Sequence, residues 1–438
     1  MEISVTSSKI LGVLFLNHDY TKIAVDNPII LLLCLFAGFG LLILTSLKKT
    51  SGDQPLSVLQ TTQMKGIAII IINHLVLFTI DSSKYFKIFA DAGAIGVSIF
   101  LMFSGYGLCI SLNKKGIQNF FSAKIVRIYF PVFLAMCLEI FLGYFFYKKN
   151  NGLFEISQIF FNIYSIDRNM WFIVFLIFWY YLTYLVFRLN LENQKKVLFL
   201  FFTSILVLSI PNVSFLWNPD ISFVWKFNAF SFPLGCLLGL NSQVINKKIG
   251  ILLEQSLAKF FGIIISCIVI SKICFPIANR PHVGVPLLIS LIIIIGSIYF
   301  IKTKKKLESP VEFICLILTI FILYSNFTDG LIKAEIFTIS RSFFYNLYSI
   351  FAAVSLVLLI SLLVKFNFYS YFLYFVGNIS FELYLLHGMF MYSFDFILFR
   401  GNISLTFFVY FLAICMASVA FKQLNSIVYT SALRKLHG

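Results

Sequence analysis

Charged residues are scarce in this chain, and their scarcity excludes a soluble protein. Only 12% of the 438 residues are charged, 60% are hydrophobic, and the mean hydropathy is +0.94. An average soluble domain is about 25% charged and about 45–50% apolar. The apolar residues form blocks of about 17 to 22, the length of a helix that crosses about 30 Å of hydrocarbon. We therefore predict an all-α fold, a polytopic transmembrane helical bundle of about 10 to 13 spans.

Paired cysteines are also missing from the sequence. The chain has 8 cysteines, and none of them forms a Cys-x-x-Cys pair. Zinc binding and redox chemistry therefore have no support. We interpret the cysteines as small residues inside apolar helices, and we expect no metal site.

Acidic residues are fewer than basic ones, so the chain has a formal net charge of +16. Nucleic-acid binders share such an excess, but here Lys and Arg gather in short clusters in alternate loops, which is typical of cytoplasmic loops of membrane proteins. This pattern predicts an N-terminus outside and a C-terminus inside, with membrane lipids and no nucleic acid as partners. Richness in Lys, Asn, Ile and Phe favours a bacterial cytoplasmic membrane. The basic loops contain Lys48, Lys49, Lys114, Lys115, Lys124, Arg127, Arg188, Lys195, Lys196, Lys247, Lys248, Lys259, Lys302, Lys304, Lys305, Lys306 and Lys365.

The apolar blocks divide the chain into three parts. Residues 1–55 are expected to contain one extra transmembrane helix, residues 56–421 the main membrane bundle, and residues 422–438 a short basic cytoplasmic tail. The loop at 326–345 is a candidate for a helix lying in the membrane interface. The expected spans are 28–46, 65–80, 93–112, 128–147, 170–187, 196–211, 226–242, 259–277, 285–301, 311–325, 346–364, 371–393 and 403–421.

His74 is the most informative ionisable residue, because such groups are costly inside a membrane, by about 2.5–3.5 kcal/mol when they face lipid. It follows Lys65 by nine residues, which places it about 13 Å deeper along a helix, near the bilayer midplane. An imidazole beside Asn73 can exchange a proton near neutral pH. The alternative is a core histidine that bonds to a neighbouring helix.

A second set of polar residues lies in the segment 377–387. At 100° per residue, Ser380, Tyr384 and His387 share one helix face, and Glu382 points away from it. A polar stripe on an apolar helix faces the bundle interior or water. It supplies either a functional site or hydrogen bonds between helices.

Two further segments carry candidates. Ser104 stands beside Gly105, where a ligand or another helix can approach closely, and helix packing is the favoured explanation. Lys124 and Arg127 are three residues apart and share a face at the expected cytoplasmic entry of a span. They serve either as an anchor of the positive-inside kind or as a site for an anionic ligand such as a nucleotide phosphate.

Taken together and in this order, these segments resemble the acyltransferase 3 family of integral-membrane O-acyltransferases. The resemblance runs from about residue 56 to residue 421. The blocks that carry it are the Lys-Gly-Ile-Ala run that ends in His74, Ile-Phe-Leu-Met-Phe-Ser-Gly-Tyr at 99–106, Lys-Ile-Val-Arg-Ile-Tyr-Phe-Pro at 124–131, Met-Trp-Phe-Ile at 170–173, Gly-Asn-Ile-Ser-Phe-Glu-Leu-Tyr-Leu-Leu-His at 377–387 and, more weakly, Phe-Pro-Leu-Gly-Cys-Leu-Leu-Gly at 232–239.

The resemblance implies transfer of an acyl group, usually acetyl from acetyl-CoA, to a hydroxyl of a glycan or a lipid-linked glycan. It implies His74 as the essential histidine and Arg127 as part of a basic motif. This chain departs from the family in one position. The family usually has Arg or Lys eleven residues before the histidine, where this chain has Gln63, whereas Lys65 stands nine residues before it and on the opposite helix face.

The chemistry of such a transfer fits the candidates. A hydroxyl needs a general base, which His74 can supply, and the oxyanion formed from the thioester needs a hydrogen-bond donor. Ser104, Tyr384 or a backbone amide can donate, and the sequence does not choose between them. The catalytic candidates are thus His74, Ser104, Tyr384 and His387, and the cations expected to bind the CoA phosphates are Lys124, Arg127 and Lys65.

Two other functions are compatible with many spans and polar residues inside the membrane. A transporter or flippase for a polysaccharide or its lipid-linked precursor would need polar residues along a continuous path and broken, repeated helices. A scaffold or sensor would use His74 and His387 only for packing. The sequence concentrates its polar residues near one site with a cationic mouth, which favours the enzyme.

Overall fold

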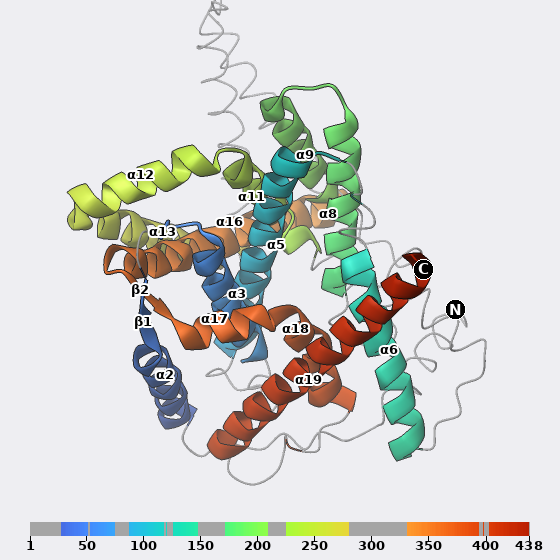
Figure 1. Ribbon diagram of the computed structural model, residues 1–438. Coiled ribbons are helices and arrows are strands. Elements are labelled where there is room, and N and C mark those ends of the chain that lie inside the picture. Colours follow the sequence, from blue (N-terminus) through green and yellow to red (C-terminus); the bar gives the residue numbers. More distant parts are fainter. Residues whose placement is uncertain are drawn as a thin grey trace, which may run out of the picture.

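The computed structural model is built almost entirely of helices, which confirms the predicted all-α class (Figure 1). It describes residues 28–50, 53–74, 87–117, 120, 126–147, 171–208, 225–279, 331–393, 397 and 403–437. The helices are α2 (Pro28–Thr45), α3 (Val58–Asn73), α5 (Lys87–Lys115), α6 (Val126–Tyr147), α8 (Trp171–Arg188), α9 (Asn193–Leu208), α11 (Ser231–Leu240), α12 (Ser242–Gln255), α13 (Leu257–Ala278), α16 (Leu331–Lys365), α17 (Tyr371–Asn378), α18 (Ser380–Gly388), the π-helical turn η4 (Met389–Ser393) and α19 (Ile403–His437).

Seven of the described helices are long and apolar enough to cross a membrane. The chain is therefore a multi-pass membrane protein. The spans predicted at 285–301 and 311–325 lie outside the described residues. The seven helices are α2, α5, α6, α8, α13, α16 and α19.

The helix that carries His74 begins earlier than the sequence predicts. α3 starts at Val58, not near residue 65, because the hydroxyl of Ser57 caps it by accepting the amide of Gln60 at 3.2 Å. Its first two turns are polar, and the hydropathy of the sequence therefore hid them. His74 closes the helix, so the predicted continuation of this span to residue 80 lies outside the described residues.

Two predicted spans are broken in the structure. In the segment 226–242 the main helix is the ten-residue α11, which ends at Leu240. The side-chain amide of Asn241 then donates to the carbonyl of Leu237 at 2.9 Å. The segment 371–393 divides into α17, α18 and η4, with the first break at Ile379. Irregular backbone at membrane depth is stable only where protein or a water-filled cavity surrounds it, and both breaks adjoin buried residues.

Two other helices are longer than predicted. α16 begins at Leu331, so most of the loop expected at 326–345 continues the following span as one helix. α19 runs from Ile403 to His437, so the residues expected as a tail are a continuation of the last helix.

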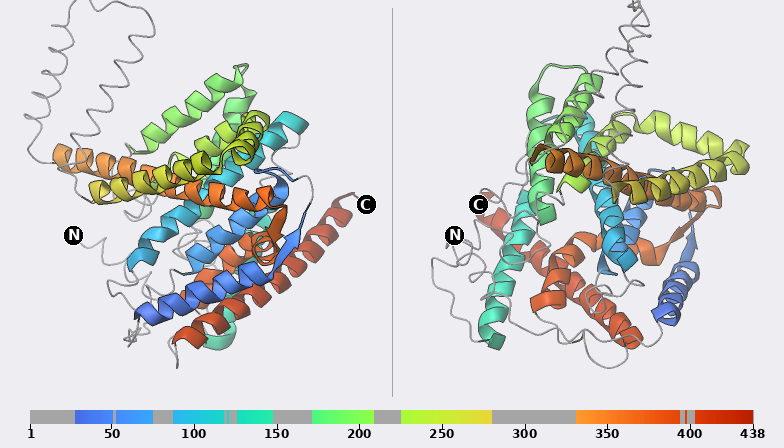
Figure 2. Two further views of the ribbon diagram at one scale, coloured as in Figure 1. Left: turned by 90° about the vertical axis from the view of Figure 1, so that its left-hand side faces the viewer. Right: turned by 180° about the vertical axis from the view of Figure 1, so that it is seen from behind.

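The basic residues that end several helices lie at one end of the bundle. The antiparallel strands β1 (Leu47–Lys49) and β2 (Phe368–Ser370) join the ends of α2 and α16. The ammonium group of Lys365 donates to the carbonyl of Leu253 in α12 at 2.6 Å. We call this side, marked by the last residues of α2, α5 and α16, the basic end, and Figure 2 shows the starts of these helices at the opposite end.

Small residues let the central helices pack backbone to backbone. A Cβ at Gly235 of α11 would lie 1.9 Å from the carbonyl oxygen of Met102 in α5, and one at Gly377 of α17 would lie 1.9 Å from that of Thr62 in α3. Gly105 packs in the same way against Phe232. The packing explanation for this glycine and for the Gly-x-x-x-Gly pair of α11 is thus confirmed.

Candidate active site

His74 lies at the end of α3, where its ring is buried and held in one orientation. Its Nδ1 lies 2.6 Å from the carbonyl oxygen of Ile70, one turn earlier. Because a carbonyl only accepts hydrogen bonds, Nδ1 carries the proton of the neutral ring and the lone pair lies on Nε2. This tautomer is the one that a general base acting through Nε2 requires.

Aromatic rings from two other helices enclose His74. The centroid of its ring lies 5.2 Å from that of Phe39 in α2 and 5.0 Å from that of Phe407 in α19. Phe39 in turn contacts Phe411 at 5.2 Å. The sequence marked α2 only as an extra span, but it supplies a wall of the site. No pattern in the sequence singles out Phe39 among 54 phenylalanines.

Asn73 precedes His74 and is completely buried. Its side-chain amide donates to the carbonyl of Ile69 at 2.8 Å, while its Oδ1 has no hydrogen-bond partner among the described residues. A buried acceptor without a partner costs about 1–3 kcal/mol. A hydroxyl or amide group of a bound ligand would satisfy it.

α19 brings His387 close to the same region. Nδ1 of His387 donates to the carbonyl of Tyr384, and the hydroxyl of Tyr410 donates to the carbonyl of His387 at 3.3 Å. Tyr410 lies three residues after Phe407, the residue that contacts His74. The ring of His74 and the backbone carbonyl of His387 therefore contact neighbouring turns of α19.

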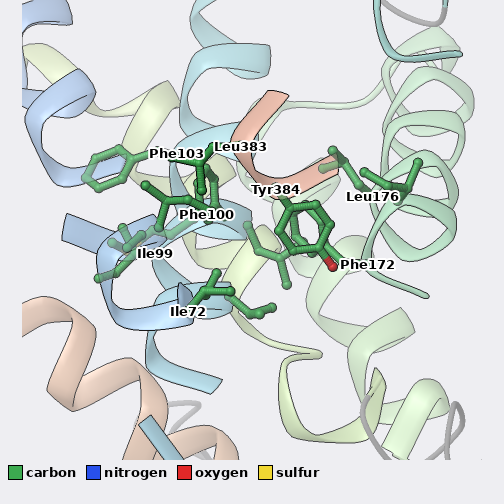
Figure 3. Packing of buried hydrophobic residues seen from close by; sticks show 14 of the residues in the cluster. Ile72, Ile99, Phe100, Phe103, Phe172, Leu176, Leu383 and Tyr384 are labelled. Carbon is green, nitrogen blue, oxygen red and sulfur yellow. The ribbon is translucent and has the colours of Figure 1, made fainter. Parts of the chain in front are cut away.

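The remaining members of the stripe on α18 are also buried. The ring of Tyr384 lies 5.0 Å from that of Phe172 in α8, and Figure 3 shows the two side by side with Leu176. Ser380 and Glu382 are buried too, so Glu382, although off the stripe, does not face solvent.

Ser104 has different neighbours from those of His74. Its hydroxyl is within hydrogen-bonding reach of Tyr180 in α8, and the adjacent Gly105 packs against α11. The structure thus places the ring of His74 and the carbonyl of His387 against α19 and leaves Ser104 at the interface of α5, α8 and α11.

Gln63, the position where the family usually has a cation, is a neutral link in a buried hydrogen-bond chain. Its Nε2 donates to Oε1 of Gln60 at 2.9 Å, and its Oε1 accepts the amide of Ser370 at 2.7 Å. Gln60 continues the chain by donating to Asp53 at 2.8 Å. Gln63 therefore ties α3 to β2, and Lys65 is half-buried two residues later.

The structure describes only part of the cationic group predicted to bind the CoA phosphates. Arg127 is exposed in the first turn of α6, which follows the basic end of α5, while Lys124 lies outside the described residues. Within the described ranges, no group of three His, Cys, Asp or Glu side chains is placed to hold a metal ion.

Fold and site together define a multi-pass membrane protein with two buried histidines among its helices. The acyltransferase 3 family model, described as an acyltransferase domain, matches residues 62–423. The chain belongs to this family and is a membrane acyltransferase, which transfers an acyl group from a donor to an acceptor. Comparison with curated proteins and with solved structures gives no match. The matched region leaves out α2, although α2 supplies Phe39 to the site.

Proposed function

We propose that the protein moves an acetyl group from acetyl-CoA to a hydroxyl of a surface or lipid-linked glycan, with His74 as the general base. The observation that carries this proposal is the tautomer of His74, which has Nδ1–H fixed on Ile70 and a lone pair on Nε2. The match of residues 62–423 to an acyltransferase domain supports the reaction class.

The reaction needs one base that takes a proton from the acceptor hydroxyl and later gives it to the leaving group. Nε2 of His74 takes the proton of the acceptor hydroxyl while the hydroxyl oxygen attacks the thioester carbonyl. The C–S bond then breaks, CoA leaves as a thiolate, and the imidazolium gives it the proton. His74 ends neutral, ready for another cycle. The rings of Phe39 and Phe407 limit the access of water, which would otherwise hydrolyse the thioester.

The oxyanion of the tetrahedral intermediate needs a donor, and we favour Tyr384 over Ser104. Tyr384 belongs to α18, which also carries His387 and packs against α3 and α19. Ser104 instead engages Tyr180 in α8. We assign His387 to positioning, because its ring and carbonyl are tied to Tyr384 and Tyr410.

Acetyl-CoA is proposed to enter at the basic end, which we assign to the cytoplasmic side of a bacterial membrane. Its phosphates would bind Arg127 and Lys124, with Lys65 further inside, because arginine and lysine form charge-assisted hydrogen bonds with phosphate. The glycan acceptor would reach His74 from the opposite end.

Labelled acetyl-CoA offers a direct test of this function. The purified protein should bind acetyl-CoA and hydrolyse it slowly without an acceptor, and cells that lack the protein should lose O-acetyl groups from a surface glycan. A protein that neither binds nor hydrolyses acetyl-CoA, in cells with unchanged glycan acetylation, would instead support the transporter or flippase.

A further inference from the structure

α12 is a short helix that is not long enough to cross the membrane. Its 14 residues, Ser242–Gln255, extend about 21 Å, whereas the hydrocarbon core is about 30 Å thick. The sequence predicts a basic loop at Lys247 and Lys248, and the structure shows that this loop is a helix. The two lysines therefore belong to a defined surface.

Two hydrogen bonds hold α12 across the basic end. Near its start, Oδ1 of Asn246 accepts the amide of Leu56, which lies between β1 and α3, at 2.8 Å. Near its end, the carbonyl of Leu253 accepts the ammonium group of Lys365, the last residue of α16, at 2.6 Å. Because both contacts lie at the same end of the bundle, α12 runs across this end and not along the spanning helices.

The inner face of α12 packs against the rim of the bundle. Leu253 is buried, with Ile249 and Leu252 partly buried beside it, in a cluster that includes Phe260 of α13 and Leu358 of α16. α13 is itself peripheral, because only 28% of its spanning window is buried inside the protein. Figure 1 shows α12 beside α13 and away from α6. α12 therefore lies at the rim, where lipid headgroups surround a membrane protein.

The outer face of α12 carries two cations between two aliphatic side chains. Val244, Lys247, Lys248 and Ile251 share one side of the helix, because they are spaced by three, one and three residues. All four are exposed, Val244 by 54% and Ile251 by 39%. Among the described residues, neither lysine has a salt bridge. Glu254 lies two turns after Lys247, about 10 Å along the axis, which is too far for an ion pair.

The partner that fits this face is the surface of a bilayer with anionic lipids. The phosphate of a headgroup accepts hydrogen bonds from lysine, and the boundary of the acyl chains takes aliphatic side chains. The basic end is assigned to the cytoplasmic side, where anionic lipids attract each nearby lysine. A free nucleotide phosphate would satisfy the lysines but would leave Val244 and Ile251 in water.

We propose that the outer face of α12 binds the phosphate headgroups of anionic phospholipids, and that this contact steadies the helix that carries His74. The link is Asn246, which accepts the amide of Leu56 just before α3. The carbonyl of Leu56 in turn accepts the hydroxyl of Tyr106 in α5 at 2.8 Å. Leu56 is buried, so a movement of α12 must displace the start of α3. This inference goes beyond the proposed donor and acceptor and does not depend on them.

Native mass spectrometry of the purified full chain tests the lipid preference. The protein in neutral detergent is titrated with phosphatidylglycerol or with phosphatidylcholine of the same acyl chains. We expect the anionic lipid to bind about tenfold more tightly, because both lysines contribute to its attraction. Equal binding of the two lipids overturns the proposal.

Paired substitutions locate the site. The variant with Lys247→Gln and Lys248→Gln should lose the preference, and it should fold because both side chains are exposed. The variant with Lys114→Gln and Lys115→Gln is the matched control and should keep the preference. Its two lysines are also adjacent and exposed, and they end α5 at the basic end. Equal loss in both variants would assign the preference to the general charge of the basic end and would overturn α12 as the site.

Hydrogen exchange in nanodiscs tests the link to α3. With phosphatidylglycerol in the disc, amides of α12 and of the first two turns of α3 should exchange about fivefold more slowly than in phosphatidylcholine alone. The variant with Lys247→Gln and Lys248→Gln should exchange equally in both discs. Exchange in α3 that is independent of the lipid overturns the link.

Binding of acetyl-CoA distinguishes this proposal from the proposed function. If the variant with Lys247→Gln and Lys248→Gln loses acetyl-CoA binding and keeps its lipid preference, the lysines bind the CoA phosphates and the lipid site is overturned. A wild-type protein that prefers the anionic lipid but binds no acetyl-CoA supports the lipid site and contradicts the proposed function alone.

Discussion

The two polar regions of this protein are built in opposite ways. His74 sits among aromatic rings from α2 and α19 and is oriented by a hydrogen bond to its own helix. The second region, which we call the Lys226 cluster, consists of Asp91, Lys226, Arg341 and Tyr345 and is dense in charges and in hydrogen bonds between separate segments. A dry, apolar setting suits acyl transfer from a thioester, whereas a buried setting rich in charged and hydrogen-bonding groups suits binding of a polar ligand. The difference suggests that the reaction and the recognition of a ligand take place in separate regions of one bundle.

The largest effect is expected from a substitution that disturbs both polar regions at once, because both depend on the packing of α5. Gly235→Ala places a Cβ 1.9 Å from the carbonyl of Met102, so the helices must separate. We expect the free energy of unfolding to fall by about 3 kcal/mol or more, measured as a lower midpoint of thermal unfolding in detergent. Gly107→Ala is the control, since nothing lies within 4 Å of its Cβ.

Phe39→Ala should affect the His74 region and spare the Lys226 cluster. Loss of the ring 5.2 Å from His74 frees the imidazole and admits water. We expect acyl transfer to fall about tenfold and the ratio of thioester hydrolysis to transfer to rise. Phe36→Ala, on the 63% exposed Phe36 of the same helix, should change neither rate. Equal effects of the two variants would contradict the role of α2 as a wall of the site.

Arg127→Gln should weaken the binding of acetyl-CoA without affecting the chemical step. Because the exposed mouth then has one cation fewer to bind the CoA phosphates, we expect the KM for acetyl-CoA to rise about fivefold while kcat stays within about twofold. Steady-state kinetics at low ionic strength measure both. Arg188→Gln, another exposed arginine at a helix end, should leave KM unchanged, and a similar rise there would point to general surface charge.

The smallest effect is expected at Ser104. Ser104→Ala should lower kcat by less than about threefold, because its neighbours belong to α8 and α11. Tyr384→Phe should lower kcat about a hundredfold if its hydroxyl binds the oxyanion. Stopped assays with labelled acetyl-CoA compare the two, and the reverse order would make Ser104 the donor.

Most of the fold follows from hydropathy, and the exceptions have physical causes. Long apolar helices such as α8 and α13 are predicted to within a few residues. α3 begins early because its polar first turns are buried by α17 and β2, which depends on contacts more than 300 residues away. α11 and α17 pack backbone to backbone against α5 and α3 through Gly235 and Gly377, and composition does not reveal such contacts.

The two regions differ in how far the sequence reveals them. His74 and His387 lie in recognisable blocks, so the sequence singles them out as candidates. Phe39 could not, because only the fold places α2 against the histidine. The Lys226 cluster combines a residue from a predicted span with Arg341 from a predicted loop and Asp91 from a span's edge, and only tertiary packing joins them.

The central claim is that His74 transfers the proton of the acceptor hydroxyl. The most direct test uses the His74→Gln variant, purified as protein that elutes in the same way as the folded wild type. The measurement is the rate at which this variant transfers acetyl from labelled acetyl-CoA to an isolated glycan. We predict a loss of at least about a hundredfold, with unchanged binding of acetyl-CoA. Transfer within about threefold of wild type would contradict the account.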